Sequence, residues 1–456
     1  MQFNRRMTLA VGVAALLFSA CSKSNNNGGG SSQTKTGETL AASFTGGTLT
    51  GSATMTSGTT YNITSDIVVP VGDTLLLQSG VTLKMGSNVD VLIHGTFISL
   101  GTKASPNWIT TGATKNDSPI PIASYATDPA FAGTWYGLNC DTTCPLFVMK
   151  WTHVEFAGGT FGAAPVAGTA ANTASFAIMF QNINGSFDME DSWIYGSTDD
   201  AVRITDGKVN IMRNTFEKCG SNTGEAVNVK SGTQGDIAYN LFMGAATNGS
   251  KISNAGATPI ECNVHCYNNT YVDCGYRQSS TSGHGGSINL EKGGEATIYN
   301  NLIVNCKIGL RIVSTADTSN AHYGNTYFYG DAAAVTGDFY SVGDVTHPQT
   351  TDIPAPSTYL PSTYTLGASY DGTALVGQNN PQFKTFTLPN TNYQEVDYVS
   401  GFDFHLNSGS QAIGKGTTSF TAMALVKLDP NYGATEITQP GSDIGCYQSN
   451  GTGNAH

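Results

Sequence analysis

Short stretches in the middle of the chain alternate aliphatic and polar residues, which is the period-two pattern of a strand with one buried face. The clearest examples are residues 202–204, 227–229, 288–290 and 310–312. Similar stretches, separated by glycines, begin near Thr48 and continue to Thr111. The pattern predicts many short strands joined by tight corners, and no long helix.

An asparagine recurs at the same point of a repeated phrase between these strands; its five copies are Asn214, Asn240, Asn269, Asn301 and Asn325. A repeat of roughly two to three dozen residues indicates stacked units that bury their apolar faces against one another. Coils about 4.8 Å apart would place the asparagines in one column, with their amides hydrogen-bonded along it. We therefore expect a structural asparagine ladder in an all-β, right-handed parallel β-helix of roughly ten coils.

The first residues indicate export and lipid attachment. Residues 1–21 contain Arg5 and Arg6, a short apolar run and then small residues, which is typical of a secretory signal and too short to span a bilayer. Residues 17–21 resemble the lipobox of bacterial lipoproteins, so Cys21 is the predicted lipidation site. An ordinary cleaved signal that leaves a free cysteine is the alternative.

Composition divides the rest of the chain into three parts. Residues 22–42 are rich in Ser, Asn, Gly and Thr and read as a flexible tether. Residues 43–330 carry the repeat and form the β-helix. Residues 331–456 are an irregular extension and a C-terminal capping coil, whose closing segment we expect to return to the last coil and cover its open strand edges.

The charge of the chain bears on its partners. The net charge is −12 and only 12% of residues are charged, whereas nucleic-acid-binding proteins usually carry a basic surface. No nucleic-acid partner is expected. The membrane is a partner through the lipid on Cys21, which predicts attachment to a bacterial outer membrane. Whether the body faces the periplasm or the cell surface stays open, because no acidic residue follows Cys21 before Glu38.

Eight cysteines follow Cys21, and disulfides are the usual state in an oxidising compartment. The pairs Cys140 with Cys144 and Cys262 with Cys266 are close enough in sequence to close small loops. Three others follow a ladder asparagine by five residues and are expected to stack in the core: Cys219, Cys274 and Cys306. A metal site at Cys262, His265 and Cys266 lacks a second ligand pair, so no metal is predicted.

Several phrases resemble those of bacterial right-handed β-helix lipoproteins with a pectate-lyase-like architecture. They include residues 80–84, 106–110, 135–138, 150–159 and 380–383, and two segments near the end of the chain, residues 403–414 and 443–447. Gln411 and Cys446 depart from the proline and alanine more usual at those points. The resemblance covers most of the chain and implies the architecture, but it says almost nothing about activity.

Alternation predicts an outer stripe on one sheet, because the aliphatic residues point inward and their neighbours outward. The stripe contains Arg203, Asn228, Asn289 and Arg311, with Lys251 in the coil between, and a parallel row contains Thr205, Lys230, Ser253 and Glu291. A long flat face suits an extended polymer, and arginine forks suit carboxylates and sulfates. The leading hypothesis is a cell-envelope lipoprotein that binds polysaccharide through Arg203, Asn228, Lys251, Asn289, Glu291 and Arg311.

Two kinds of enzyme are alternatives. In β-helix lyases that act on uronates, a Lys or Arg removes the proton beside the carboxylate while calcium or another arginine stabilises the charge. Lys230 or Lys251, with Arg203 and Arg311, could form such a set, and calcium would be its only cofactor. Asp199, Asp200, His284 and Arg311 superficially resemble the residues of polygalacturonases, but several coils separate Asp200 from His284.

Two further readings need no catalysis. A structural or adhesive surface protein without glycan activity fits the same repeat. Exposed aromatic rings near the earlier coils could also stack on a sugar; the candidates are Trp135, Tyr136, Trp151, Phe156, Trp193 and Tyr195.

Overall fold

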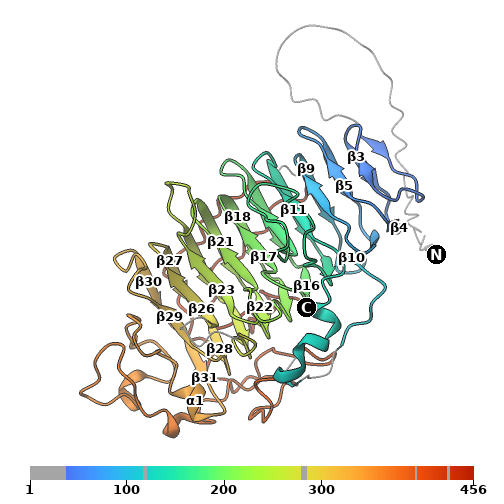
Figure 1. Cartoon of the computed structure of the whole chain (residues 1–456). Helices are drawn as coiled ribbons and strands as arrows, with labels where there is room; N and C mark the ends of the chain where they lie inside the picture. Colours follow the sequence, from blue (N-terminus) through green and yellow to red (C-terminus); the bar gives the residue numbers. More distant parts are fainter. Residues whose placement is uncertain (1–36, 117–120, 279–284, 396–397, 429–431) are drawn as a thin grey trace, which may run out of the picture. The chain divides into compact units, whose positions relative to one another are not determined.

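The chain forms a parallel β-helix in the computed structural model, which describes residues 37–116, 121–278, 285–395, 398–428 and 432–456 (Figure 1). Three parallel sheets run the length of the helix, and each coil adds one strand to sheet B, then one to sheet A, then one to sheet C. Sheets B and C have ten strands each, which gives the ten coils that the repeat predicts. Parallel connections of this kind are right-handed as a rule.

The strands are short in all three sheets. Sheet A contains β1 (Glu38–Thr39), β3 (Ala53–Met55), β6 (Thr74–Leu77), β9 (Thr96–Leu100), β12 (Leu146–Lys150), β15 (Ser186–Glu190), β18 (Gly207–Met212), β21 (Thr233–Ala238), β24 (Asn263–Tyr267), β27 (Glu295–Tyr299) and β30 (Ala321–Gly324). Sheet B contains β2 (Gly47–Thr48), β5 (Ile67–Val69), β8 (Val91–Ile93), β11 (Leu138–Cys140), β14 (Ile178–Phe180), β17 (Val202–Ile204), β20 (Val227–Val229), β23 (Asn248–Ser253), β26 (Gly286–Glu291) and β29 (Leu310–Ile312). Sheet C contains β4 (Thr60–Ile63), β7 (Thr82–Met85), β10 (Asn107–Thr110), β13 (Thr152–Glu155), β16 (Trp193–Tyr195), β19 (Thr215–Glu217), β22 (Leu241–Met243), β25 (Thr270–Val272), β28 (Leu302–Val304) and β31 (Tyr327–Tyr329).

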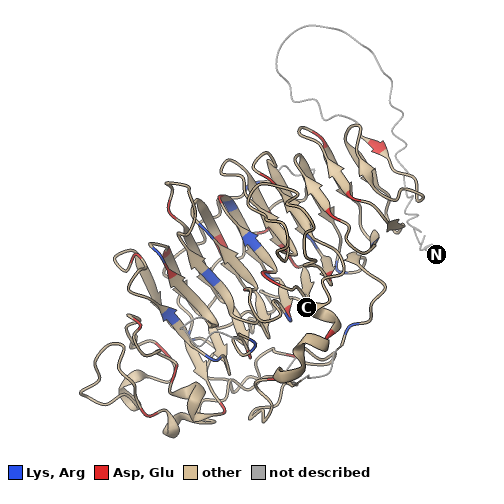
Figure 2. Cartoon of the chain, viewed as in Figure 1, with Lys and Arg blue, Asp and Glu red and all other residues tan. Residues whose placement is uncertain are grey.

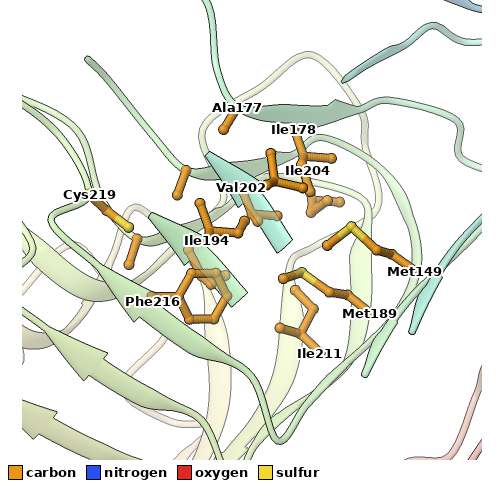
Figure 3. Packing of buried hydrophobic residues seen from close by; sticks show 14 of the residues in the cluster. Met149, Ala177, Ile178, Met189, Ile194, Val202, Ile204, Ile211, Phe216 and Cys219 are labelled. Carbon is orange, nitrogen blue, oxygen red and sulfur yellow. The ribbon is translucent and has the colours of Figure 1, made fainter. Parts of the chain in front are cut away.

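The inward residues of the three sheets meet in one continuous apolar core. Figure 3 shows a section of it, in which side chains from all three sheets point toward one another: Met149, Met189 and Ile211 of sheet A, Ile178, Val202 and Ile204 of sheet B, and Ile194 and Phe216 of sheet C. Aromatic rings stack from coil to coil inside it, as Phe216, Phe242 and Tyr271 do at 4.9 and 4.8 Å between centroids. The alternation of aliphatic and polar residues therefore predicts correctly which strand side chains point into the core.

The asparagine ladder forms at the corner between sheets A and C, with four of its five expected members. Asn214, Asn240, Asn269 and Asn301 are fully buried, and each Oδ1 from Asn240 onward accepts the backbone N–H and the side-chain amide of the asparagine before it, at 2.9–3.1 Å. The prediction for Asn325 is wrong. Leu302 pairs with Tyr327, so Thr326 takes the ladder position. Asn325 lies one residue earlier, in the left-handed corner conformation that Asn300 also adopts.

The β-helix begins earlier than the predicted tether allows. Glu38 and Thr39 pair with Ala53 and Thr54 in sheet A, and Leu40 joins the core. Residues 38–42 therefore belong to the first coil and not to a tether. The predicted signal, Cys21 and most of the tether lie outside the described residues, as does His284. None of the helices in the described part of the chain is long and apolar enough to span a membrane.

The cysteines differ from their expected state. All eight that follow Cys21 are buried free thiols, so neither expected disulfide is formed. Cys262 and Cys266 lie four residues apart in an alternating, extended segment that leads through β24. Four residues of a strand span about 13 Å, whereas disulfide-bonded cysteines need Cα atoms within about 7 Å. Burial raises the pKa of Cys262 and of Cys266 to about 12, which keeps these thiols protonated.

The extension after β31 first caps the helix. Val345 hydrogen-bonds to Ile312 of sheet B, and Ile353 pairs with Tyr327 of sheet C, so both sheets gain a partial further strand. The cap also contains α1 (Ala333–Thr336), η3 (Pro356–Thr358) and η4 (Thr373–Leu375). An earlier insertion contains η1 (Ile122–Thr127) and η2 (Pro129–Phe131) and is fixed by the buried ion pair of Asp128 with Lys218, at 2.7 Å.

The closing segment, residues 398–456, contacts the last coil as expected, where the Lys415 carbonyl accepts a hydrogen bond from Asn325, but Val345 and Ile353 of the cap, and not this segment, pair with the last strands of sheets B and C. The closing segment runs back over the outer faces of sheets A and C, and its end lies beside coils in the middle of the helix (Figure 1). Ala434 accepts a hydrogen bond from Lys150, and His456 contacts Thr215. A second apolar cluster fills the interface between the segment and sheet C; it includes Met243, Val272, Leu302 and Val304 from the sheet and Phe404, Ile444 and Tyr447 from the segment.

Candidate functional site

The register of sheet B brings the predicted outer stripe together. Arg203 pairs with Asn228, Asn228 with Lys251, Lys251 with Asn289, and Asn289 with Arg311. These five residues, which we call the sheet B row, therefore follow one another over four inter-strand steps, or about 19 Å. Figure 2 shows the basic residues on β17, β23 and β29 along the facing sheet. Ser253 and Glu291 pair in a parallel row two residues further along each strand.

The row is less cationic than the sequence suggests, because buried carboxylates pair with its basic residues. Arg203 contacts Asp200 at 2.6 Å, Lys251 contacts Glu225 at 3.2 Å and Glu291 at 3.6 Å, and Arg311 contacts Asp344 at 3.3 Å. The sequence pattern does not identify Glu225 and Asp344 as site residues. Glu225 precedes β20 instead of lying in it, and Asp344 comes from the cap, so the alternation gives no signal for either.

The two amides of the row join its charged groups into one network. Asn228 donates to Asp200 at 2.8 Å and to Glu225 at 2.9 Å. Asn289 donates to Glu291 at 3.0 Å and accepts from Arg311 at 2.6 Å. Both amides are almost fully buried, although they lie on the outer face of the sheet, and Asn228 Oδ1 has no hydrogen-bond partner among the described residues. Burying so many polar groups is unfavourable for folding, which favours a functional role for them.

Burial and neighbouring charges separate the pKa values of the two linked carboxyl groups. Burial acts to raise the pKa of Asp200, but the Arg203 guanidinium and nearby hydrogen bonds outweigh it and hold that pKa at about 2. Burial and the charge of Asp200 raise the pKa of Glu225 to about 8. Asp200, Glu225 and Glu291 outnumber Arg203 and Lys251 in this part of the network. Glu225 is therefore the carboxyl that takes up a proton near neutral pH.

The two candidate lysines, Lys230 and Lys251, differ in the direction of their pKa shifts and in their ion pairs. Burial acts to lower the pKa of Lys251, but Glu225 and Glu291 outweigh it, so this pKa is raised and the ammonium is locked in ion pairs. Burial, Arg203 and Lys251 together lower the pKa of Lys230. Within the described residues, Lys230 makes no ion pair. Lys230 is therefore the basic group of the site best able to bind a ligand anion or accept a proton.

Irregular segments bound the row at both ends. Before Arg203, the loop that follows β13 packs Val166 and Phe176 over Leu92 and Met179, and the Arg203 guanidinium lies 4.0 Å from the Phe176 ring centroid. After Arg311, the cap supplies Asp344. The polar part of the sheet B face is thus limited to these five coils.

Glu225 gives a prediction for the pH dependence of stability. Its pKa is about 8 in the folded chain and near 4.5 in the unfolded chain, so the folded state binds one more proton between these values. Its contribution to stability is full below the unfolded pKa and is lost as the pH rises through about 8. Glu225→Gln should flatten this dependence: between about pH 5 and about pH 8, the wild-type free energy of unfolding should fall by at least about 1 kcal/mol more than that of the variant. If urea denaturation gave the same change in the free energy of unfolding with pH for wild type and Glu225→Gln, this prediction would be contradicted.

The other candidate ligand groups in the described residues do not form a convincing site. Glu190, Asp191 and Glu436 lie together, but Lys150 and Arg213 already neutralise them. A second acidic cluster, Glu261, Glu295 and Asp317, is partly or fully exposed. Calcium needs six to eight oxygen ligands, whereas the carboxylates beside the sheet B row, on Asp200, Glu225, Glu291 and Asp344, face arginine or lysine. The row does not fit a calcium ion.

The aromatic candidates do not form a sugar platform. Trp135, Phe156 and Tyr195 are buried. On the outer face of sheet C, Trp108, His153, Trp193 and His456 stack on one another, with centroid distances of 3.8, 5.9 and 5.5 Å. Each of these rings therefore has at least one face packed against a neighbouring ring, which makes the stack a poor platform for a sugar. Burial lowers the pKa of His153 to about 3, so this ring is neutral within the stack.

Comparison of the chain with protein-family models, with curated proteins and with solved structures found no match.

Proposed function

We propose that the chain is a cell-envelope lipoprotein whose sheet B row binds an extended, acidic polysaccharide. One observation carries the proposal: five polar residues align in register over about 19 Å of a sheet face, with the unpaired Lys230 beside them. A regular row on a rigid sheet matches a polymer that repeats its hydroxyl and carboxylate groups. The membrane partner is the outer membrane, reached through a lipid on Cys21; this part rests on the sequence alone.

Lys230→Met tests the proposal with little damage to the fold, because Lys230 makes no ion pair or side-chain hydrogen bond among the described residues. A charge-assisted hydrogen bond contributes about 1.5–3 kcal/mol, so polygalacturonate should bind roughly 10- to 100-fold more weakly to the variant. Isothermal titration calorimetry would measure the affinities of the wild type and the variant for polygalacturonate.

The matched control is Lys208→Met, which removes an exposed lysine on sheet A. It should leave the affinity unchanged. Equal affinities for wild type and Lys230→Met would remove the role of Lys230. Absence of binding to any of a panel of acidic and neutral polysaccharides would favour the structural or adhesive alternative. Replacing Arg203 or Arg311 is a poorer test, because each substitution leaves a buried carboxylate without its partner.

A polysaccharide lyase is the second candidate, and the state of Lys230 favours it. An amine with a lowered pKa, next to Arg203 and Lys251, suits proton removal beside a uronate carboxylate. Lys251 is a poor base because its neighbours Glu225 and Glu291 raise its pKa. Mass spectrometry of the incubated glycan would detect unsaturated products from the wild type and none from Lys230→Met. Intact glycan with normal binding would leave the chain a binding protein.

A further inference from the structure

A pocket of about 380 Å³ lies where the irregular parts of the chain meet. Its wall includes Ile122 from the insertion, Tyr276 and Lys307 from the corners that precede sheet B, Asp338 from the cap, and Tyr393 from the extension. Each of these segments departs from the regular coil, and long departures from a solenoid often shape its binding face. Their convergence on one pocket is the first reason to regard it as a site.

The pocket lies beside the end of the sheet B row. Asp338 accepts a backbone hydrogen bond from Gly309, two residues before Arg311. Its carboxyl group lies close enough to Lys307 and Arg311 for both cations to influence it electrostatically. Asp338 therefore stands between the pocket and the last member of the row. The cap that supplies Asp338 and Asp344 also closes this end of sheet B.

The groups in the pocket suit a sugar ring with an acidic substituent. Tyr276 and Tyr393 form an aromatic wall, with their ring centroids 5.4 Å apart, and the Tyr276 hydroxyl is fixed by the Asn305 carbonyl at 2.9 Å. An aromatic wall can pack against the apolar face of a sugar. Among the described residues Lys307 makes no ion pair, so its ammonium is available to a carboxylate. Gln394 and Asp338 add groups that can bond hydroxyls.

We infer that this pocket holds the terminal uronate of a polysaccharide chain bound along the sheet B row, so that the protein recognises chain ends. The inference rests on the proposed function of the row. A glycan that follows the row toward the cap cannot continue along sheet B past Asp344, and the pocket beside Asp338 offers space for its last residue. Lys307 binds the terminal carboxylate, and Tyr393 packs on the ring.

The test compares polygalacturonate with its short oligomers, using the full chain and calorimetry. For the wild type, the affinities of long and short chains should agree when concentrations are expressed per chain end. Lys307→Met should weaken both by about tenfold or more, the loss of one charge-assisted contact. Tyr393→Ala should do the same. The control Lys384→Met, at an exposed lysine of the extension, should bind as the wild type does.

The outcomes separate this inference from the proposed function. Affinities that agree per sugar residue instead of per chain end, with normal binding by Lys307→Met and Tyr393→Ala, would overturn recognition of chain ends and leave binding along the row intact. If the wild type binds neither polygalacturonate nor its oligomers, both proposals fail. Weakening by Lys230→Met, Lys307→Met and Tyr393→Ala, but not by Lys384→Met, supports both.

Discussion

Replacing Arg213 by methionine is expected to lower the free energy of unfolding by about 3–5 kcal/mol. The Arg213 guanidinium is buried and binds Asp191 at 2.8 and 2.9 Å and Glu190 at 3.1 Å, and it also donates to the Glu436 carbonyl at 2.8 Å. Methionine is shorter and uncharged, so it leaves the buried carboxylate of Asp191 without its arginine partner and that of Glu190 with Lys150 alone. Urea denaturation would measure the loss.

The same substitution should loosen the closing segment. Arg213 and Lys150 hold its backbone at Glu436 and Ala434, and the Glu436 N–H donates to Glu190. Limited proteolysis should therefore cut this segment faster in Arg213→Met than in wild type. Lys208→Met, an exposed change on β18, the strand that ends just before Arg213, should alter stability by no more than about 0.5 kcal/mol. A loss below about 1 kcal/mol for Arg213→Met, with unchanged proteolysis, would show that the network does not hold the segment.

Asn240→Ala is expected to have the next largest effect, about 2–5 kcal/mol. Its side chain accepts the Asn214 N–H at 2.9 Å and donates to the Ile211 carbonyl at 2.9 Å. Alanine would leave the buried Asn214 N–H without its partner, at a cost of about 1–3 kcal/mol, and would also remove the amide's hydrogen bonds to Ile211 and Asn269. The free energy of unfolding from urea denaturation is again the measurement.

Asn325→Gly is the matched comparison, because Asn325 lies one position off the ladder. Its side chain makes one exposed hydrogen bond, to the Lys415 carbonyl. Glycine tolerates the left-handed conformation found there, so the loss should stay below about 1 kcal/mol. Equal losses for Asn240→Ala and Asn325→Gly would refute the ladder register described above.

The sequence predicted those parts of the fold that depend on local alternation. Because successive side chains of a strand point to opposite faces, the aliphatic residues of β17, β20, β26 and β29 were enough to align Arg203 with Arg311. The placement of Lys251 in the same row followed from the coil spacing. The prediction for Asn325 was wrong because the tripeptide Asn325-Thr326-Tyr327 matches Asn269-Thr270-Tyr271. The ladder position is set instead by the pairing of the strand that follows, in which Leu302 pairs with Tyr327.

The parts that could not be predicted depend on contacts between distant segments. Nothing in the alternation links Arg311 to Asp344, or Lys150 to Ala434. One signal for the closing segment was available. The strands β22, β28 and β31 contain only apolar or aromatic residues, without polar alternates, and such strands are typically covered on both faces. The second apolar cluster provides that cover.

The most direct test of the proposed function is a crystal structure of the chain with a short oligogalacturonate. The account predicts sugar density along the sheet B row from Arg203 to Arg311, with a carboxylate within hydrogen-bond distance of Lys230 Nζ. Density confined to another face, or an empty row at a ligand concentration that saturates binding in solution, would contradict it.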